Sequence, residues 1–308
     1  MRGVPRGLLA AACFALVVAG CARMPHTGVT SIRSSSVGEL RDYLRTYPAD
    51  VDTFRDRGPF AVDTREDLRL SPGNGDVVSA DLHLANVADR APLVILLHGQ
   101  DNTRSDHAYQ GLHLASWGLH TLVLQLAADG PWIDHGRTMA RLVALIQRSP
   151  DALDARIDPR RIVLVGHSFG GTAVGVALGS GAPVLGGVLL DPASLGWELH
   201  GYLRRIERPV MIIGADEDVF AALDRDDFFR YVRAGVMELS VRDASHEDAQ
   251  FPLSNDRLPS ATEAHQITFV AALTSAALSL ANTGRLDAAW GSYESALKNG
   301  KFIDPRQK

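Results

Sequence analysis

The sequence predicts an α/β fold in which a mostly parallel sheet carries an antiparallel N-terminal hairpin and has helices on both faces. Two observations support this class. Unbroken apolar runs, typical of parallel strands covered on both faces, occur at 93–97, 120–126, 162–165, 188–190 and 210–213. Stretches with helical spacing separate these runs, at about 105–117, 134–148, 169–179 and 224–234.

The remaining elements complete this sheet. Apolar residues alternate with polar ones in 68–70 and 78–84, on either side of a turn-forming segment at 71–76, which predicts the hairpin. A last strand is expected near 236–241 and a long helix at about 261–282. Few residues separate Ser194 from Arg208, so we expect no large cap domain over the carboxyl ends of the strands.

The composition indicates one large domain. Of 308 residues, 46% are hydrophobic and 22% charged, which is typical of a globular chain with a single large core. We expect a signal peptide at 1–20, a tether with a short helix at 21–57, the main α/β domain at 58–283 and an accessory helix at 284–308. The net charge is −5 and the basic residues are scattered, which argues against nucleic acid as a partner.

The first 21 residues have the features of an export signal. Arg2 and Arg6 precede an apolar run at 7–18 that is too short to span a bilayer. The segment Val17-Val18-Ala19-Gly20-Cys21 resembles a bacterial lipobox, which implies acylation of Cys21 and an exported lipoprotein held at a membrane of the cell envelope. The alternative is an ordinary cleavage nearby and a secreted product.

A serine follows one of the predicted central strands. Gly166-His167-Ser168-Phe169-Gly170 lies between the strand ending at Val165 and an apolar helix. In this setting the segment resembles the nucleophile elbow of the α/β-hydrolase fold, where small neighbours allow a sharp turn and expose the serine hydroxyl at the carboxyl end of the sheet. A glycine-rich turn with an incidental serine is the alternative.

The same fold supplies two backbone donors for an oxyanion hole. One comes from the loop after the third strand, here His98-Gly99-Gln100-Asp101, and the other from the residue after the nucleophile. The resemblance therefore assigns these donors to the backbone N–H groups of Gln100 and Phe169.

A serine nucleophile needs a histidine base and a carboxylate partner, and this fold places them in the order serine, acid, histidine. Of eleven histidines, His246 is the one in a loop after the last predicted strand and before the long helix. For the acid, Asp216 and Asp218 follow the strand that ends at Ile213, and Asp191 ends the preceding strand. Spacing does not choose among these aspartates.

Several segments resemble the bacterial cutinases and polyester hydrolases, over about residues 58–275. They are Gly58-Pro59-Phe60, Arg156-Ile157-Asp158-Pro159-Arg160-Arg161, the serine segment 166–171, Ile212-Ile213-Gly214-Ala215-Asp216-Glu217-Asp218 and Asp243-Ala244-Ser245-His246. This resemblance implies Asp218 as the acid, followed by Asp216 and then Asp191. Other segments, Ala173 to Gly179, Asp191-Pro192 and His246-Glu247-Asp248, resemble chlorophyllases.

Two features depart from the cutinases. Ala193 stands after Pro192 where they carry an aromatic residue, and their carboxy-terminal disulfide is missing, since the only two cysteines are Cys13 and Cys21. An activity on plastics is therefore not inferred.

The residues that line the substrate site are expected to be apolar. Trp132, Ile133 and Trp197 are the apolar candidates for lining the substrate, with ordinary core packing as the alternative. An open apolar groove favours bulky or lipidic esters. No cofactor is expected, and no metal, because His98, His107, His113, Asp101 and Asp106 follow no zinc spacing and are expected to be solvated.

The sequence thus predicts a serine hydrolase that cleaves small-molecule or polymeric carboxylic esters through an acyl-enzyme. The alternatives are a triad enzyme for another acyl bond, such as a lactone, thioester or amide, and a non-catalytic binding lipoprotein on a hydrolase fold.

Overall fold

The computed structural model describes residues 36–46, 49–149, 151, 153–217, 224–254, 258 and 261–308. Within them, nine strands form one sheet in the order β1-β2-β4-β3-β5-β6-β7-β8-β9. The strands are β1 (Val62–Gly73), β2 (Asp76–Ala85), β3 (Ala91–Leu97), β4 (His120–Gln125), β5 (Ile157–His167), β6 (Gly186–Leu190), β7 (Val210–Ala215), β8 (Val236–Val241) and β9 (Phe302–Gln307). Strands β3 to β8 pair in parallel, whereas β1, β2 and β9 run antiparallel to their neighbours.

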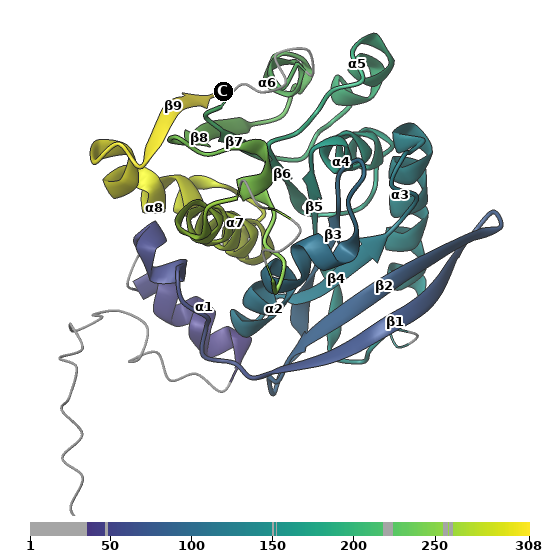
Figure 1. Ribbon diagram of the computed structural model, residues 1–308. Coiled ribbons are helices and arrows are strands. Elements are labelled where there is room, and N and C mark those ends of the chain that lie inside the picture. The colour runs from purple at the N-terminus through teal and green to yellow at the C-terminus, as the bar shows by residue number, and fades with distance from the viewer. Residues whose placement is uncertain are drawn as a thin grey trace, which may run out of the picture.

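Helices cover both faces of this sheet (Figure 1). The α-helices are α1 (Val37–Thr46), α2 (Ala108–Ser116), α3 (Trp132–Arg148), α4 (Phe169–Gly179), α5 (Trp197–Leu203), α6 (Asp226–Tyr231), α7 (Glu263–Thr283) and α8 (Asp287–Lys298). Short 3-10 helices are η1 (Val51–Phe54), η2 (Arg104–His107) and η5 (His246–Ala249). Helices α1, α2, α7 and α8 lie on one face, and α3, α4 and α5 on the other.

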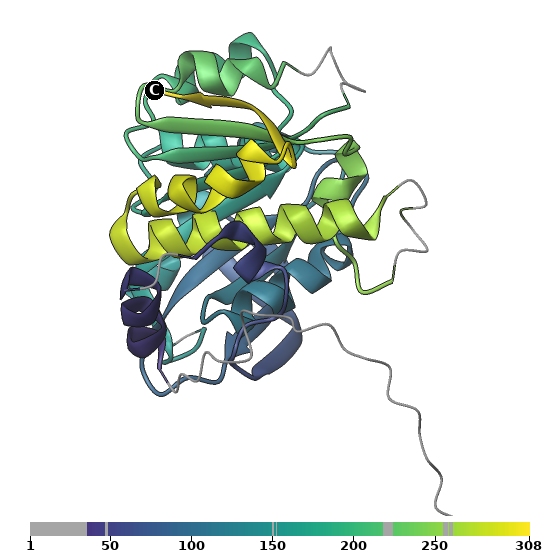
Figure 2. The same cartoon turned by 90° about the vertical axis from the view of Figure 1, so that its left-hand side faces the viewer.

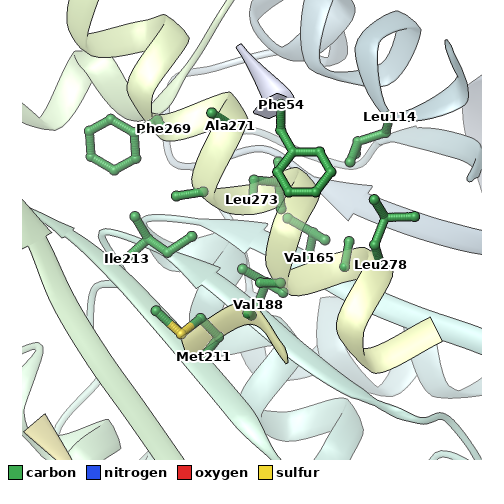
Figure 3. Packing of buried hydrophobic residues seen from close by; sticks show 14 of the residues in the cluster. Phe54, Leu114, Val165, Val188, Met211, Ile213, Phe269, Ala271, Leu273 and Leu278 are labelled. Carbon is green, nitrogen blue, oxygen red and sulfur yellow. The ribbon is translucent and has the colours of Figure 1, made fainter. Parts of the chain in front are cut away.

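Alternate residues of the central strands face the two layers. Val94 and Leu96 join the cluster under α7, whereas Leu93, Ile95 and Leu97 join the cluster under α3 and α4. This is the two-fold alternation of a strand, and because both faces are covered, every one of these residues is apolar. Figure 3 shows the first cluster, in which residues of α7 such as Phe269 and Leu273 pack on Val188 and Ile213.

Helix α7 is long and apolar enough to cross a membrane, and among the described helices it alone passes that test. It lies across the sheet with α8 beside it (Figure 2), and 83% of its most apolar window is buried. Its composition is accounted for by its place in the core, where each fully buried leucine or phenylalanine stabilises the fold by about 1.5–3 kcal/mol.

The predicted fold class is confirmed, and the structure adds one element. After Gly284 the sequence predicts a helix alone, but α8 is followed by β9, which pairs with β8 at the edge of the sheet. The strand 236–241, expected to be the last, is therefore an inner strand. The predicted signal peptide, Cys21 and most of the tether lie outside the described residues.

Candidate active site

Ser168 lies on the turn between β5 and α4, with φ 53° and ψ −126°. A non-glycine residue is strained in this conformation, which persists only where surrounding contacts fix it. The Ser168 N–H donates to the Leu190 carbonyl at 3.0 Å, and the Ser168 carbonyl accepts from Gly171 at 2.9 Å and from Ala193 at 3.0 Å. Three backbone hydrogen bonds therefore hold the turn.

The glycines around Ser168 are required by close backbone contacts. A Cβ at Gly166 would lie 2.2 Å from the carbonyl oxygen of Gly170, and a Cβ at Gly170 would lie 2.5 Å from the carbonyl oxygens of Leu97 and His98. Backbone atoms cannot move away as a flexible side chain can. The turn therefore accepts only glycine at both positions.

The serine is more enclosed than the sequence predicts. An exposed hydroxyl is expected, but Ser168 is only 5% exposed. The loop after β3 accounts for the difference, because a Cβ at Gly99 would lie 2.7 Å from the Cβ of Ser168. The side chain is thus recessed among the loops at the carboxyl end of the sheet.

His246 begins η5, in the loop after β8. Ser245 and Asp248 form a capping box there, in which the Ser245 N–H donates to Asp248 Oδ2 at 2.8 Å. The His246 Nδ1 lies 2.6 Å from Asp191 Oδ2, and both side chains are nearly buried, with 12% and 13% exposed. A carboxylate at this distance fixes the tautomer and orientation of the ring.

Among the aspartates that the structure describes, Asp191 is the one whose carboxylate contacts the His246 ring. It immediately follows β6, with φ 39°, and its Oδ1 accepts from the Ala215 N–H at 3.0 Å and from Arg225 Nη1 at 2.7 Å. Burial by itself would raise the pKa of Asp191, but the hydrogen bond with His246 and the charge of Arg225 outweigh it and hold this pKa below its usual range. Asp191 is therefore ionised at neutral pH.

Of the two aspartates preferred in the sequence, the structure describes Asp216. Asp216 Oδ2 accepts from the Asp243 N–H at 2.9 Å, so this carboxylate supports the loop that leads to His246. Asp218, the first choice, lies outside the described residues. Among the candidates that the structure describes, the contact with His246 favours Asp191 over Asp216.

The two predicted oxyanion donors come from segments that meet at Ser168. Gly99 touches the serine, and Gln100 follows it, while Phe169 is the first residue of α4. Neither the Gln100 N–H nor the Phe169 N–H donates a hydrogen bond to any residue that the structure describes. The first N–H groups of a helix have no partner within it and carry partial positive charge, which suits an anion.

Three histidines near the site correct an expectation. His98, His107 and His113 were expected to be solvated, but all three are fully buried. His98 Nδ1 lies 2.8 Å from the Gly99 carbonyl, and His113 Nε2 lies 2.9 Å from the Phe54 carbonyl. Burial lowers the pKa of His107 and of His113 to about 4, so these rings are neutral packing elements. The described residues contain no group of three or more ligands placed to hold a metal ion.

Sequence reasoning missed His167, the residue before the serine. Its Nε2 lies 3.2 Å from the His246 carbonyl oxygen, and the two rings lie 4.6 Å apart between centroids. Because a carbonyl only accepts, this nitrogen carries the proton. Burial holds the pKa of His167 well below its usual value, so it supports the base as a neutral ring.

The predicted lining residues separate into three environments. Trp132 is 5% exposed, and its ring stacks on Phe169, with 5.8 Å between centroids and 16° between planes. Ile133 is partly buried against the core under α3 and α4. Trp197, at the start of α5, is 80% exposed. Trp132 therefore supports the turn, whereas Trp197 presents an exposed apolar ring at the start of α5.

A serine on a tight turn between a central parallel strand and a helix, with a histidine and an aspartate from later strand ends, defines the α/β-hydrolase class. The model of the alpha/beta hydrolase family matches residues 94–293, so the chain belongs to that family.

The chain is also similar to several curated cutinases. The chain is 28% identical to Cutinase 1 of Thermobifida cellulosilytica over 180 residues, which cover 56% of this chain and 65% of the relative. It is 28% identical to a cutinase of Thermobifida fusca (strain YX) over 180 residues, 56% of each, and 28% identical to Cutinase est1 of Thermobifida alba over 167 residues, 53% of this chain and 54% of the relative. The predicted likeness to cutinases is confirmed. The chain spans roughly half to two thirds of the length of these relatives.

Proposed function

We propose that this chain is a serine hydrolase that cleaves carboxylic esters, with Ser168 as nucleophile, His246 as base and Asp191 as acid. The contact that carries the proposal is the 2.6 Å approach of His246 Nδ1 to Asp191 Oδ2, in a chain whose Ser168 has the strained backbone of a nucleophile elbow. The likeness to cutinases supports esters as the substrate class.

In the acylation step, Ser168 Oγ attacks the ester carbonyl carbon while His246 Nε2 takes the hydroxyl proton. The C–O bond to the alcohol then breaks, and the imidazolium returns the proton to the departing alkoxide. Asp191 stabilises the imidazolium through Nδ1 and keeps the ring in the required tautomer. The products of this step are an alcohol and an acyl-enzyme on Ser168.

In the deacylation step, water replaces the alcohol. His246 takes a proton from water, the hydroxide adds to the acyl carbon, and the serine leaves with that proton. In both steps the tetrahedral oxyanion binds the backbone N–H groups of Gln100 and Phe169, each worth about 2.7–4 kcal/mol by analogy with measured deletions.

The expected substrates are bulky or lipidic esters, which can be small molecules or polymers. The segment between β6 and β7 contains only the short helix α5. No cap domain is therefore inserted there among the described residues. Trp197 offers an exposed ring on α5, which suits an apolar acyl or alcohol group.

The cellular context rests on sequence alone. The lipobox-like segment ending at Cys21 supports export and acylation of Cys21, which would hold the enzyme at a membrane of the cell envelope, and a secreted product is the alternative. Growth with labelled palmitate tests this, because the chain should take up label and Cys21→Ala should abolish it.

A fluorophosphonate probe tests the enzymatic proposal. It should label the purified chain on the peptide that contains Ser168, and Ser168→Ala should abolish both labelling and release of p-nitrophenol from short-chain esters. Ser180→Ala is the matched control, because Ser180 lies exposed at the other end of α4 and should leave both signals unchanged.

The other outcomes point to different conclusions. An unlabelled, folded wild-type chain would favour the non-catalytic binding lipoprotein. Labelling of Ser168 with faster turnover of a thioester or lactone than of a matched ester would keep the triad and change the acyl bond.

A further inference from the structure

Arg225 holds the oxygen of Asp191 that does not face His246. Arg225 immediately precedes α6. Its Nη1 donates to Asp191 Oδ1 at 2.7 Å and to the Ala215 carbonyl at 2.9 Å, and its Nη2 donates to Ser240 Oγ at 3.1 Å. The planar guanidinium is therefore bound on several sides, which fixes its orientation.

The backbone of β7 is shaped to receive this group. A Cβ at Gly214 would lie 2.0 Å from Arg225 Nη1, so the guanidinium lies directly against the glycine. The next residue, Ala215, donates its N–H to the same Asp191 Oδ1 at 3.0 Å. Two donors thus hold Oδ1, which directs Oδ2 toward His246.

A second carboxylate balances the charge of Arg225. Glu238, on β8, is only 4% exposed, and its Oε1 lies 3.3 Å from Arg225 Nε. Its Oε2 lies 2.6 Å from Nη2 of Arg306, on β9, and Arg306 Nη1 lies 2.6 Å from Asp226 Oδ1. Burial raises the pKa of Glu238, and the two guanidinium groups oppose that rise.

We propose that Arg225 is a positioning residue for the catalytic acid, and that the alternating charges of Asp191, Arg225, Glu238 and Arg306 set the pH range in which the base works. These four residues are called the charge chain below. Their role rests on the proposed function, since it assumes that Asp191 is the acid for His246.

The sign of each contribution follows from charge. A cation bound to Asp191 opposes the formation of a second cation on His246, so Arg225 favours the neutral base and extends activity toward lower pH. The buried anion Glu238 acts in the opposite direction, and more weakly, because it lies one residue farther along the charge chain. The side chains of Asp191 and Glu238 are only 13% and 4% exposed, and that of Arg225 is 30% exposed, so solvent screens these effects only in part.

Other ionisable groups face these residues from each neighbouring element. Around His246 and the charge chain they are His167 from β5, Asp216 after β7, Asp243, Glu247 and Asp248 from the loop around His246, His265 from α7, Asp226 from α6 and Lys308 after β9. His167 is neutral in the relevant range because burial lowers its pKa. Each variant below leaves all of these groups in place.

The test is the pH profile of kcat/KM for a p-nitrophenyl ester, from about pH 5 to about pH 9. In Arg225→Gln the midpoint of the acidic limb should rise by about 0.5–1 pH unit, and in Glu238→Gln it should fall by a smaller amount. Opposite shifts are the distinguishing result, because a merely structural loss in either variant would lower kcat without moving the midpoint in opposite directions.

Arg225→Lys separates charge from position. It keeps the cation but loses the rigid fork, so the midpoint should stay near the wild-type value while kcat falls with KM unchanged. Arg285→Gln is the matched control, because Arg285 is 74% exposed and pairs only locally with Asp287, and its profile should match the wild type.

The outcomes separate this inference from the proposed function. A folded wild type that neither hydrolyses esters nor takes the fluorophosphonate probe overturns the proposed function. An active wild type whose midpoint is the same in Arg225→Gln and Glu238→Gln overturns the inference alone. If Arg225→Gln does not fold, the other two variants still decide the inference. An upward shift of the acidic midpoint in Glu238→Gln, or a large shift of that midpoint in Arg225→Lys, contradicts the proposed signs.

Discussion

The two halves of the candidate active site are held by different forces. Around Ser168 the turn depends on backbone hydrogen bonds and on glycines that touch backbone atoms. Around Asp191 the side chains are held by ion pairs with Arg225 and, through it, with Glu238. Steric contacts do not change with pH, whereas charges do. The nucleophile half should therefore respond to volume, and the acid–base half to charge and pH.

The largest expected effect tests the acid–base half. Asp191→Asn should lower kcat by about 10⁴, as for an asparagine in other serine triads, because the amide favours the wrong histidine tautomer and cannot stabilise the imidazolium. Steady-state kinetics on a p-nitrophenyl ester, with thermal melting to verify folding, gives the measurement.

Asp218→Asn is the matched comparison for that variant. We expect it to retain most of the wild-type kcat. A loss of about 10⁴ in Asp218→Asn, with Asp191→Asn active, would move the acid to the position that the cutinase resemblance implies.

A smaller loss is expected on the nucleophile side from added volume. Gly99→Val would place a Cβ 2.7 Å from the Cβ of Ser168 and displace the loop that carries the Gln100 N–H. Loss of one oxyanion donor corresponds to about 10²–10³ in kcat, and the loss should be the same at every pH.

Gly201→Ala is the control for that volume change. Gly201, on α5, has no atom within 4 Å of its would-be Cβ and should tolerate alanine without loss of activity. A pH-dependent loss in Gly99→Val would break the proposed division between the two halves.

Acid should destabilise the fold through its buried histidines. An unfolded histidine binds a proton near its usual pKa of about 6.5, whereas burial lowers the pKa of His107 to about 4. Between these values the unfolded chain binds more protons, so this stability is fully present above about pH 6.5 and is lost as the pH falls toward 4, by up to about 3 kcal/mol for His107.

Denaturant unfolding at several pH values measures this dependence. His107→Gln should reduce its slope between about pH 6.5 and pH 4, and an unchanged slope would contradict the assignment to that ring. Asp191, whose pKa is lowered, adds stability that is lost only at lower pH, as the pH falls below its unfolded value of about 3.9 toward its folded pKa.

The smallest effect concerns substrate size. Trp197→Ala should raise KM for long-chain or bulky aryl esters by about three- to tenfold, because burial of a large apolar contact is lost, while short-chain esters and the melting temperature change little. Equal KM changes for short and long esters would show that Trp197 does not contact the distal part of the substrate.

The parts of the fold that were predictable have strong local signals. Continuous apolar runs marked the parallel strands, and the glycines around Ser168 marked the turn. Strand β9 had no such signal, since Phe302–Gln307 is short, contains Pro305 and is half polar. Its pairing with β8 is a long-range contact that periodicity does not report.

The site shows the same limit. His246 is the candidate base because its loop follows a strand. Three aspartates lie near strand ends, however, and only hydrogen bonds distinguish Asp191 from Asp216. Arg225 lies 34 positions from Asp191, and no motif connects them. The sequence also did not reveal that His98 and His107 are buried. Histidine is a polar residue, but its neutral ring can pack in a core.

Strand β9 also has a consequence for biosynthesis. It follows every other described element in chain order, so the ribosome releases it after them. Until then, β8 presents an unpaired edge, and such edges pair readily with other chains. A nascent molecule is therefore exposed to aggregation at β8 until β9 pairs with it, and folding assistance should be most valuable before that pairing forms.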